Sequence, residues 1–410
     1  MARNIIAALD VGSSTVQTVI AERKRGEEGL RILGVGSAPS AGVRRGVIVN
    51  LEDATAAILQ SVDEARRSSG VATKSIWLAI GDAHVSVSSS RGVVAVSRAD
   101  QEISPEDIRR VISAAETFIP KNANKEILHI IPRDFKVDQE PGVKDPVGMH
   151  GVRLEVDTLI IECSTPFLKN FFKCVEGAGL RVEDYVFAPF AASEAVLTRR
   201  QKELGVLLLD IGGSTASFMV FEEGVPMHAG VIPIGGNHIT NDVAIGFQTH
   251  IDVAEQIKLA YASCLPEQIG RRDQIRLAEF LPEEQAVYPR RELAEIVEAR
   301  LQDLFELLQK ELKKIDRTRL LPAGVVLIGG SSLLPGLAEM TKQELGLPVE
   351  LGKLDSSLAA DQSAAASLIP VFGVLQWASG KMDRARPRWE DHIHNIGANK
   401  FTKWLKSLLP

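Results

Sequence analysis

Residues 5–20 read IIAALDVGSSTVQTVI, and residues 205–220 read GVLLLDIGGSTASFMV. Each stretch is an apolar run, an aspartate, a turn of small and hydroxyl-bearing residues, and a second apolar run. This pattern predicts two β-hairpins that carry the same acid and the same loop at the same place. A third apolar run at 325–328 leads into two glycines and two serines, and predicts a strand, a tight turn and then a helix.

The repeated turns have the chemistry of a phosphate-binding site. Small residues let backbone N–H groups approach phosphate oxygens closely, and hydroxyl groups add donors. A single hairpin of this kind is usually an ordinary turn, but two matched copies and a third glycine turn favour a clamp on ATP. The predicted phosphate-binding residues are Gly12, Ser13, Ser14, Thr15, Gly212, Gly213, Ser214 and Thr215. The third turn, with Gly329, Gly330 and Ser331, is predicted to lie along the α-phosphate and the adenosine.

The aspartate of each hairpin is a candidate metal ligand. Mg²⁺ prefers oxygen ligands and keeps several of its waters when it binds beside phosphates. Asp10 and Asp210 are therefore predicted to hold Mg²⁺ through its water shell.

Composition limits the class of protein. A chain of 410 residues is longer than a single hydrophobic core usually supports, so the length predicts two domains. Its 45% apolar and 24% charged residues are typical of a soluble globular protein. No apolar run reaches the roughly 18 residues of a membrane span. Three cysteines without a Cys-x-x-Cys spacing indicate reduced thiols in a cytosol. Residues 380–410 hold seven basic and three acidic residues, a net charge of +4. Because the whole chain has a net charge of −6, residues 1–379 carry −10, and such an acidic body argues against a nucleic-acid partner.

In this order, the three turns resemble those of the actin/Hsp70/sugar-kinase superfamily, and the chain is most similar to the FtsA family of bacterial cell-division actin homologues. The resemblance covers nearly the whole chain. It includes the segments 34–37, 127–132, 146–153, 231–237, 239–244 and 254–258. It implies an α/β, actin-like ATPase fold: two RNase H-like domains around a nucleotide cleft, with an inserted α+β subdomain in each half.

The resemblance also implies a division of the chain. The first half takes residues 1–83 and 165–200 around an insert at 84–164. The second half takes 201–240 and 323–377 around an insert at 241–322. A flexible linker at 378–398 and an amphipathic helix at 399–410 follow.

Glu255 and Lys258 lie three residues apart and share one face of a predicted helix. By similarity they bracket the ribose and the adenine. The alternative is a solvated ion pair on a helix surface, which would contribute little to stability and bind no ligand.

One departure from the superfamily bears on hydrolysis. Actin-like ATPases usually place a Glu or Gln at the start of the helix that links the halves, where it positions the attacking water. Here Ala188 stands at that position, and Glu194 comes six residues later. We therefore expect the chain to bind ATP and to hydrolyse it slowly or not at all.

The C-terminal segment has one apolar face. Phe401, Trp404, Leu405 and Leu408 follow helical spacing, Leu409 lies at the edge of this face, and Lys400, Lys403 and Lys406 flank it. A helix of about 16 Å cannot span the hydrocarbon core of about 30 Å, but it can lie in the interface with its lysines towards anionic lipids. The competing interpretation is a helix that docks on its own domain or on a partner protein.

The resemblance implies a function at the division site, on the cytoplasmic face of the cell membrane. The chain would self-assemble there and tether the tubulin-like protein FtsZ, whose C-terminal peptide would dock on the 241–322 insert. The 84–164 insert would contact other division proteins and further copies of the chain. The alternatives are a pilus-assembly actin-like protein, which usually lacks a membrane helix of its own, and a sugar or carboxylate kinase or a phosphatase.

Overall fold

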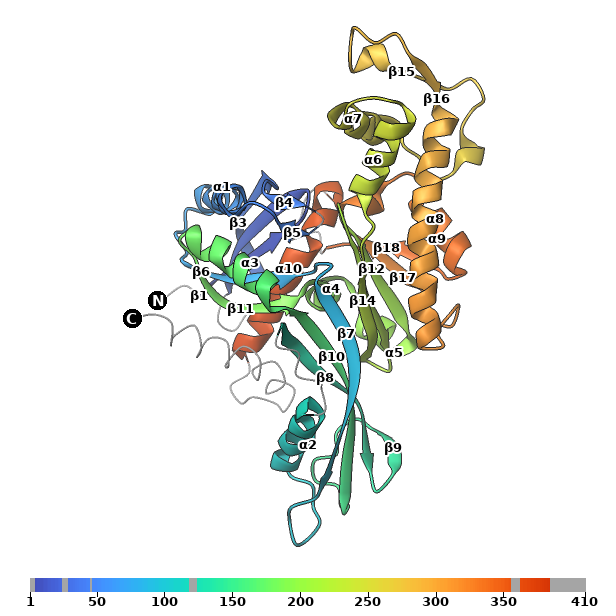
Figure 1. Cartoon of the computed structure of the whole chain (residues 1–410). Coiled ribbons are helices and arrows are strands. Elements are labelled where there is room, and N and C mark those ends of the chain that lie inside the picture. The colour runs from blue at the N-terminus through green and yellow to red at the C-terminus, as the bar shows by residue number, and fades with distance from the viewer. Residues whose placement is uncertain (1–3, 24–28, 45, 118–123, 355–361, 384–410) are drawn as a thin grey trace.

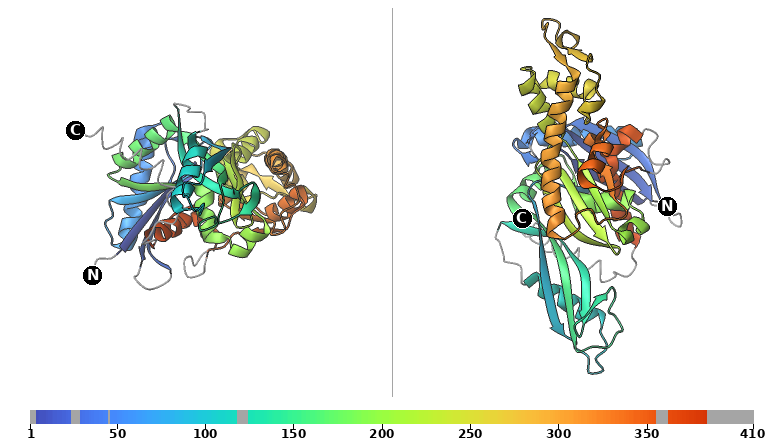
Figure 2. Two further views of the ribbon diagram at one scale, coloured as in Figure 1. Left: turned by 90° about the horizontal axis from the view of Figure 1, so that it is seen from below. Right: turned by 90° about the vertical axis from the view of Figure 1, so that its right-hand side faces the viewer.

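The computed structural model describes residues 4–23, 29–44, 46–117, 124–354 and 362–383 of the chain. Two five-stranded sheets form the centre, and a smaller unit extends from each end in opposite directions (Figures 1 and 2). Within the described ranges, no helix is both long enough and apolar enough to cross a membrane. Cys163, Cys174 and Cys264 are buried free thiols.

The first sheet has the strand order β11-β6-β1-β2-β3. Antiparallel hairpins join β1, β2 and β3, whereas β1, β6 and β11 run parallel. The helix α1 packs closely on β2 and β3 because Gly36 has no side chain: a Cβ atom there would lie 2.0 Å from the Ser61 carbonyl oxygen. The bounds are β1 Asn4–Val11, β2 Thr15–Arg23, β3 Leu30–Pro39, α1 Leu51–Ser69, β6 Ser75–Ile80, α3 Thr165–Gly177 and β11 Arg181–Phe187, with a small hairpin of β4 Val43–Arg44 and β5 Val47–Ile48.

The second sheet repeats this arrangement with the order β14-β13-β12-β17-β18. Alternate residues of β12 face opposite cores, as the period of a strand requires. Leu207 and Leu209 pack with α8 and α9, whereas Val206 and Leu208 join the core of the first half. The bounds are β12 Val206–Ile211, β13 Ala216–Glu222, β14 Val225–Ile232, α8 Arg290–Lys314, β17 Val325–Ile328, α9 Leu337–Leu345 and β18 Val349–Leu351.

The unit beside the first sheet is a four-stranded sheet of order β7-β10-β8-β9 with α2 packed on it. The helix α2 begins after Ser104, where the Asp107 N–H donates to the Ser104 hydroxyl and the Asp107 carboxylate accepts from Ser104 in return. Arg133 of β8 donates to the Met227 carbonyl oxygen at 3.0 Å and so ties this unit to the second half. The bounds are β7 Val85–Ala95, α2 Pro105–Thr117, β8 Lys125–Val137, β9 Glu140–Val143 and β10 Arg153–Ser164.

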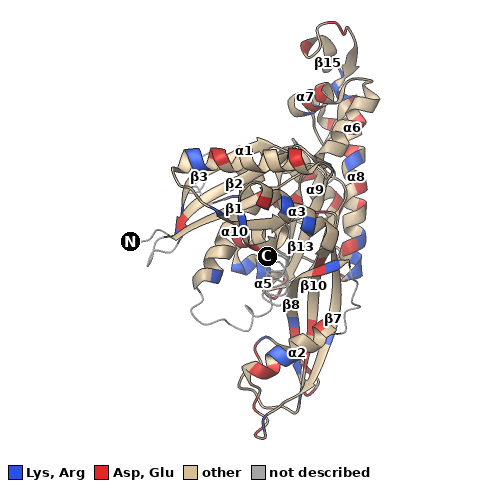
Figure 3. Ribbon diagram, turned by 60° about the vertical axis from the view of Figure 1, so that its left-hand side comes forward, with Lys and Arg blue, Asp and Glu red and all other residues tan. Residues whose placement is uncertain are grey.

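The unit beside the second sheet is mainly helical, and the long helix α8 supports it (Figure 1). Tyr288 stacks on Phe247 with ring centroids 4.2 Å apart and joins its small hairpin to the helices. Acidic and basic residues are interspersed along α8 in Figure 3, and pairs such as Arg300 with Asp303 join successive turns of this helix. The bounds are α6 Gly236–Gly246, α7 Ile251–Tyr261, β15 Gln274–Arg276 and β16 Val287–Pro289.

The helices α4 (Ala188–Val196) and α10 (Gln362–Asp383) cross each other between the two sheets (Figure 1). A short helix, α5 (Arg199–Leu204), connects α4 to β12. The crossing is close because Gly373 presents no side chain to Ala191: a Cβ atom at Gly373 would lie 2.3 Å from the Ala191 carbonyl oxygen.

Two predicted boundaries are wrong at α10. The sequence predicts that 323–377 belongs to the second half, but α10 packs on β1, β2 and β6 of the first sheet. The sequence also predicts a linker from residue 378, but the helix continues to Asp383. Its last turn is held by the ion pair of Lys381 with Asp184, and the Lys381 ammonium also lies 4.8 Å from the Trp377 ring centre. The remainder of the predicted linker, 384–398, and the predicted helix 399–410 lie outside the described residues.

Candidate functional site

A cavity of about 470 Å³ lies between the two halves. The two hairpin turns, the turn after β17, and α7 line it, and so do parts of α4 and α10. The structure thus brings together every cleft residue that the sequence predicts: Asp10, Gly12, Ser13, Ser14, Thr15, Asp210, Gly212, Gly213, Ser214, Thr215, Glu255, Lys258, Gly329, Gly330 and Ser331. These predicted residues come from four separate segments of the chain, which therefore converge on one space.

The two hairpin turns have the same backbone geometry. The Gly12 N–H donates to the Thr15 carbonyl oxygen at 3.0 Å, and the Gly212 N–H donates to the Thr215 carbonyl oxygen at 2.9 Å. In both turns a glycine follows the last strand residue, two positions after the aspartate, so the backbone can reverse within four residues.

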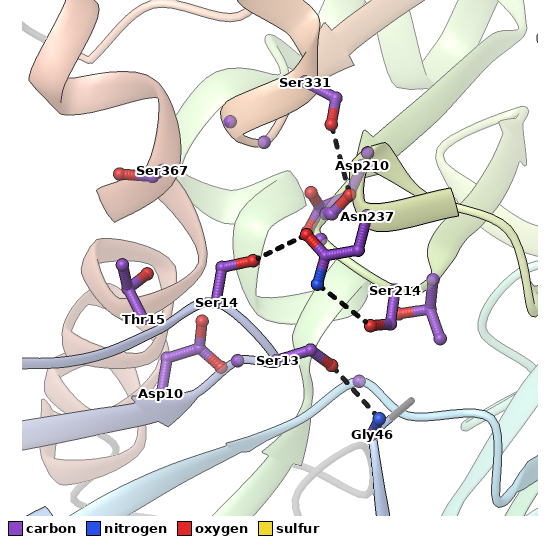
Figure 4. Close-up of a pocket in the computed structure, with 18 of the residues that line it drawn as sticks. Asp10, Ser13, Ser14, Thr15, Gly46, Asp210, Ser214, Asn237, Ser331 and Ser367 are labelled. Carbon is purple, nitrogen blue, oxygen red and sulfur yellow. Dashed lines mark hydrogen bonds between the residues drawn. The ribbon is translucent and has the colours of Figure 1, made fainter. Parts of the chain in front are cut away.

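The turns also meet across the cavity (Figure 4). The Ser14 hydroxyl donates to the Asn237 side-chain oxygen at 3.3 Å, and the Asn237 amide donates to the Ser214 hydroxyl at 3.4 Å. A Cβ atom at Gly213 would lie 2.2 Å from the Ser14 hydroxyl oxygen, so a larger residue there would displace this hydroxyl from its contact with Asn237. Sequence analysis assigned no role to Asn237. The Gly-Gly-Asn sequence directly after a strand and its bend was the local signal for it.

Asp10 and Asp210 face each other in a buried setting. Burial raises the pKa of Asp10 to about 6. Burial, and then the charge of Asp10, raise the pKa of Asp210 to about 7. Gly329 has a φ of +86° and packs directly on Asp210, since a Cβ atom there would lie 2.3 Å from a carboxylate oxygen. The Asp10 charge disfavours ionisation of Asp210, whereas a cation bound in the cavity would favour it.

The pair Glu255 and Lys258 is more than a solvated surface contact. Lys258 is only 7% exposed, and its ammonium lies 2.6 Å from the Glu255 carboxylate. The same ammonium donates to the Thr240 hydroxyl at 2.8 Å and to the Gly236 carbonyl oxygen at 3.3 Å. Lys258 is thus fixed against α6 at the edge of the cavity.

The remaining lining residues include several that sequence reasoning gave no binding role. Gln17 of β2 is buried, and its amide donates to the Ser367 hydroxyl of α10 at 2.9 Å. Ala188 lines the cavity at the start of α4. Glu194 instead receives a hydrogen bond from Lys202 at 2.6 Å and does not line the cavity. Asp82, which follows β6, is a further acidic residue of the lining.

Comparison with known proteins agrees with this geometry. The family model described as "Cell division protein FtsA" matches residues 207–369, and the model "SHS2 domain inserted in FTSA" matches residues 82–162. The cell division protein FtsA of Pseudomonas aeruginosa is 38% identical over 85% of this chain and 82% of its own length.

The chain belongs to the FtsA family. The FtsA proteins of Bacillus subtilis and Escherichia coli are 33% and 32% identical over 83% and 85% of this chain, covering 77% and 84% of their own lengths. This FtsA-family chain is accordingly an actin-like protein of cell division.

Solved structures show the same fold at low sequence identity. The PilM-PilN type IV pilus biogenesis complex contains a chain that matches 90% of this FtsA-family protein and 98% of its own length, with a TM-score of 0.65 and 18% identity. MreB5 of Spiroplasma citri bound to ADP matches 93% of this chain and 97% of its own, with a TM-score of 0.54 and 11% identity. The predicted actin-like ATPase fold is thereby confirmed.

Proposed function

We propose that this FtsA-family protein binds ATP with Mg²⁺ in its cleft, assembles with copies of itself, and holds FtsZ at the cell membrane through its C-terminal helix. The observation that carries the proposal is the meeting of two matched hairpins across one cavity, joined by Ser14, Asn237 and Ser214. The distant relative MreB5 from Spiroplasma citri, solved with ADP, is consistent with a nucleotide in such a cleft.

The donors around the cavity suit a triphosphate. The turns supply backbone N–H groups and serine and threonine hydroxyls, while Gly330 leaves open space in which an added Cβ would meet nothing within 4 Å. Glu255 and Lys258 would lie beside the ribose and the adenine. Asp10 and Asp210 would hold Mg²⁺, which supplies charge neutralisation for the phosphates. In the described part of the chain no cluster of three or more metal-ligating side chains occurs, so phosphates and water would complete the shell.

Nucleotide turnover would be slow. Ala188 offers no polar atom at the position where we expect a water-positioning side chain, and Glu194 is bonded to Lys202 instead. Bound ATP would then act mainly as a structural ligand that stabilises the closed cleft. Turnover near the enzyme-like range of about 1–10 per second would contradict this.

The proposed anchor rests on the sequence of 399–410. Its apolar face of four large side chains, with Leu409 at the edge, and its three lysines favour an interfacial helix on anionic lipid. The proposed partner surfaces are the 241–322 insert for the C-terminal peptide of FtsZ, and the 84–164 insert for self-association and other division proteins. A role in pilus assembly or as a sugar kinase is less favoured, because the chain belongs to a cell-division family and carries this tail.

Liposome co-sedimentation tests the anchor. Four chains are compared, each with and without Mg-ATP: the full chain, a truncation after Ala398, Trp404→Glu, and Ser407→Glu as a control with the same added charge on the polar face. We expect the full chain and the control to pellet with anionic vesicles, more so with ATP, and the truncation and Trp404→Glu to stay in the supernatant. Equal pelleting of all four would refute the anchor, and a drop of several degrees in the melting temperature of Trp404→Glu would favour a docked helix.

A further inference from the structure

Asp82 occupies a distinctive place in the cleft. It lies two residues beyond the end of β6, and β6 runs beside β11, which leads directly into Ala188. The two strands are so close at this point that a Cβ atom at Gly81 would lie 2.8 Å from the Ala188 Cβ. Asp82 therefore brings a carboxylate to the part of the cavity where Ala188 supplies none.

The Asp82 carboxylate also contacts Gly46, the residue whose N–H group binds the turn of the first hairpin. A Cβ atom at Gly46 would be 2.1 Å from the Asp82 Oδ1 atom, so the carboxylate packs directly on that glycine. The Gly46 N–H in turn donates to the Ser13 hydroxyl at 3.1 Å. The carboxylate and Ser13 thus flank the same glycine of the cavity lining. Figure 4 shows the hydrogen bond between Gly46 and Ser13.

One oxygen of this carboxylate has no partner. Oδ1 of Asp82 is buried and accepts no hydrogen bond in the part of the chain that the structure describes, although backbone N–H groups of Ala83 and His84 act on the carboxyl group. A buried acceptor without a donor is unfavourable, because its lost hydration is not replaced. Such an atom is usually retained where a water or ligand supplies the missing donor.

We propose that Asp82 is the general base that orients and deprotonates the water attacking bound ATP. This inference rests on the proposed function. The water oxygen forms a bond to the γ-phosphorus as the bond from that phosphorus to the β,γ-bridging oxygen breaks. ADP leaves with the bonding electron pair, and one water proton passes to the Asp82 carboxylate and then to solvent. The products are ADP and orthophosphate.

The surroundings of Asp82 suit such a base. Burial raises the pKa of Asp82 to about 7, against the lowering effect of the two backbone N–H groups. A base whose pKa lies near the working pH is the most effective. The titratable groups beside it are His84, whose pKa burial lowers, and Cys163, whose pKa is raised to about 12 by burial and then by the Asp82 charge. Neither group changes charge between about pH 7 and 8.5, where Asp82 becomes a carboxylate. Asp10 and Asp210 titrate near pH 6 and 7 without nucleotide, but in the Mg-ATP complex the cation would keep them ionised.

The test compares Asp82→Asn and Asp82→Glu with the wild-type chain and with Asp63→Asn, a half-exposed carboxylate on α1 away from the cavity. Single-turnover phosphate release from Mg-ATP and equilibrium ATP binding are measured on each full-length protein from pH 5.5 to 8.5. We expect Asp82→Asn to release phosphate about 100-fold more slowly, with ATP affinity within about threefold. The wild-type rate should rise through about pH 7. The Asp82→Asn rate should not rise in this way, Asp82→Glu should recover part of the rate, and Asp63→Asn should match the wild type.

Three results would overturn the proposal. Asp82→Asn retains the wild-type rate, or it loses affinity as much as rate, or the wild-type chain binds ATP and releases no phosphate at all. In the last case nucleotide binding, and with it the proposed function, still stands. A wild-type chain that binds no ATP would instead contradict the proposed function itself.

Discussion

The crossing of α4 and α10 makes a quantitative prediction about Gly373. An alanine there would place its Cβ 2.3 Å from the Ala191 carbonyl oxygen, 2.4 Å from the Ala191 carbonyl carbon and 2.6 Å from the Ala192 nitrogen. All three atoms belong to the backbone of α4, so one helix must move as a whole. Overpacking a core costs about 1–3 kcal/mol of folding free energy, and we expect a cost of about 3 kcal/mol here because the neighbouring atoms are backbone. Alanine is favoured over glycine in a helix by about 1 kcal/mol, so the expected net loss of stability is about 2 kcal/mol.

Gly380 in the same helix is the matched control, because a Cβ atom there meets nothing within 4 Å. Gly380→Ala should therefore raise stability by up to about 1 kcal/mol. Thermal unfolding of the nucleotide-free full chain, followed by circular dichroism, measures the difference. For a cooperative unit of about 150–250 residues, a loss of 2 kcal/mol lowers the melting temperature by about 4–8 °C. If Gly373→Ala proved as stable as Gly380→Ala, the close crossing of the helices would be refuted.

Two further predictions concern the cleft. Lys258→Met removes a buried ammonium that bonds Thr240 and Glu255. It should weaken ATP binding about 10–100-fold in calorimetry, because hydrogen bonds to charged groups are worth about 1.5–3 kcal/mol. Unchanged affinity would exclude a binding role for Lys258. The raised pKa values of Asp10 (about 6) and Asp210 (about 7) mean that the folded state holds protons more tightly than the unfolded state. Their contribution to the stability of the nucleotide-free chain is therefore complete below about pH 4 and is lost as the pH rises through 6 to 7. Asp210→Asn should consequently be more stable than the wild type at pH 8 and gain little at pH 5 in urea unfolding, whereas an equal gain at both values would contradict a buried carboxylate pair.

Local chemistry made part of this site predictable from sequence. An aspartate followed by small hydroxyl-bearing residues, between two apolar runs, encodes strand, turn and acid within about ten residues, and it occurs twice. Asn237 had only the weaker signal of a Gly-Gly-Asn sequence after a strand, and Asp82 had no local signature. Their positions depend on the approach of Gly213 to Ser14 and of Gly46 to the Asp82 carboxylate, which are contacts between distant segments.

The same reason explains the errors at α10. Charge and composition after Lys381 predicted a linker, because such residues seldom fill a core. The helix nevertheless continues to Asp383, since Lys381 pairs with Asp184, which lies 197 residues earlier in the chain. The packing of α10 on the first sheet was likewise decided by tertiary contacts, because the sequence of the helix does not indicate which half it covers.

α10 also connects the two activities that we propose for the chain. Its Ser367 and Pro370 line the nucleotide cavity, and its Gly373 contacts α4, the other helix between the halves. The chain continues from its last turn towards the predicted membrane segment. Burying the apolar face of one such segment is worth at most about 8–15 kcal/mol gross, much of which is lost to ordering it. A single copy would therefore be a reversible anchor, while an assembly that presented many segments at high effective concentration would be a firm one. If ATP favours the assembled state, it would strengthen attachment without any change in the membrane segment itself. α10 would then link the two activities, because its middle lines the cavity and the predicted tail follows it in sequence.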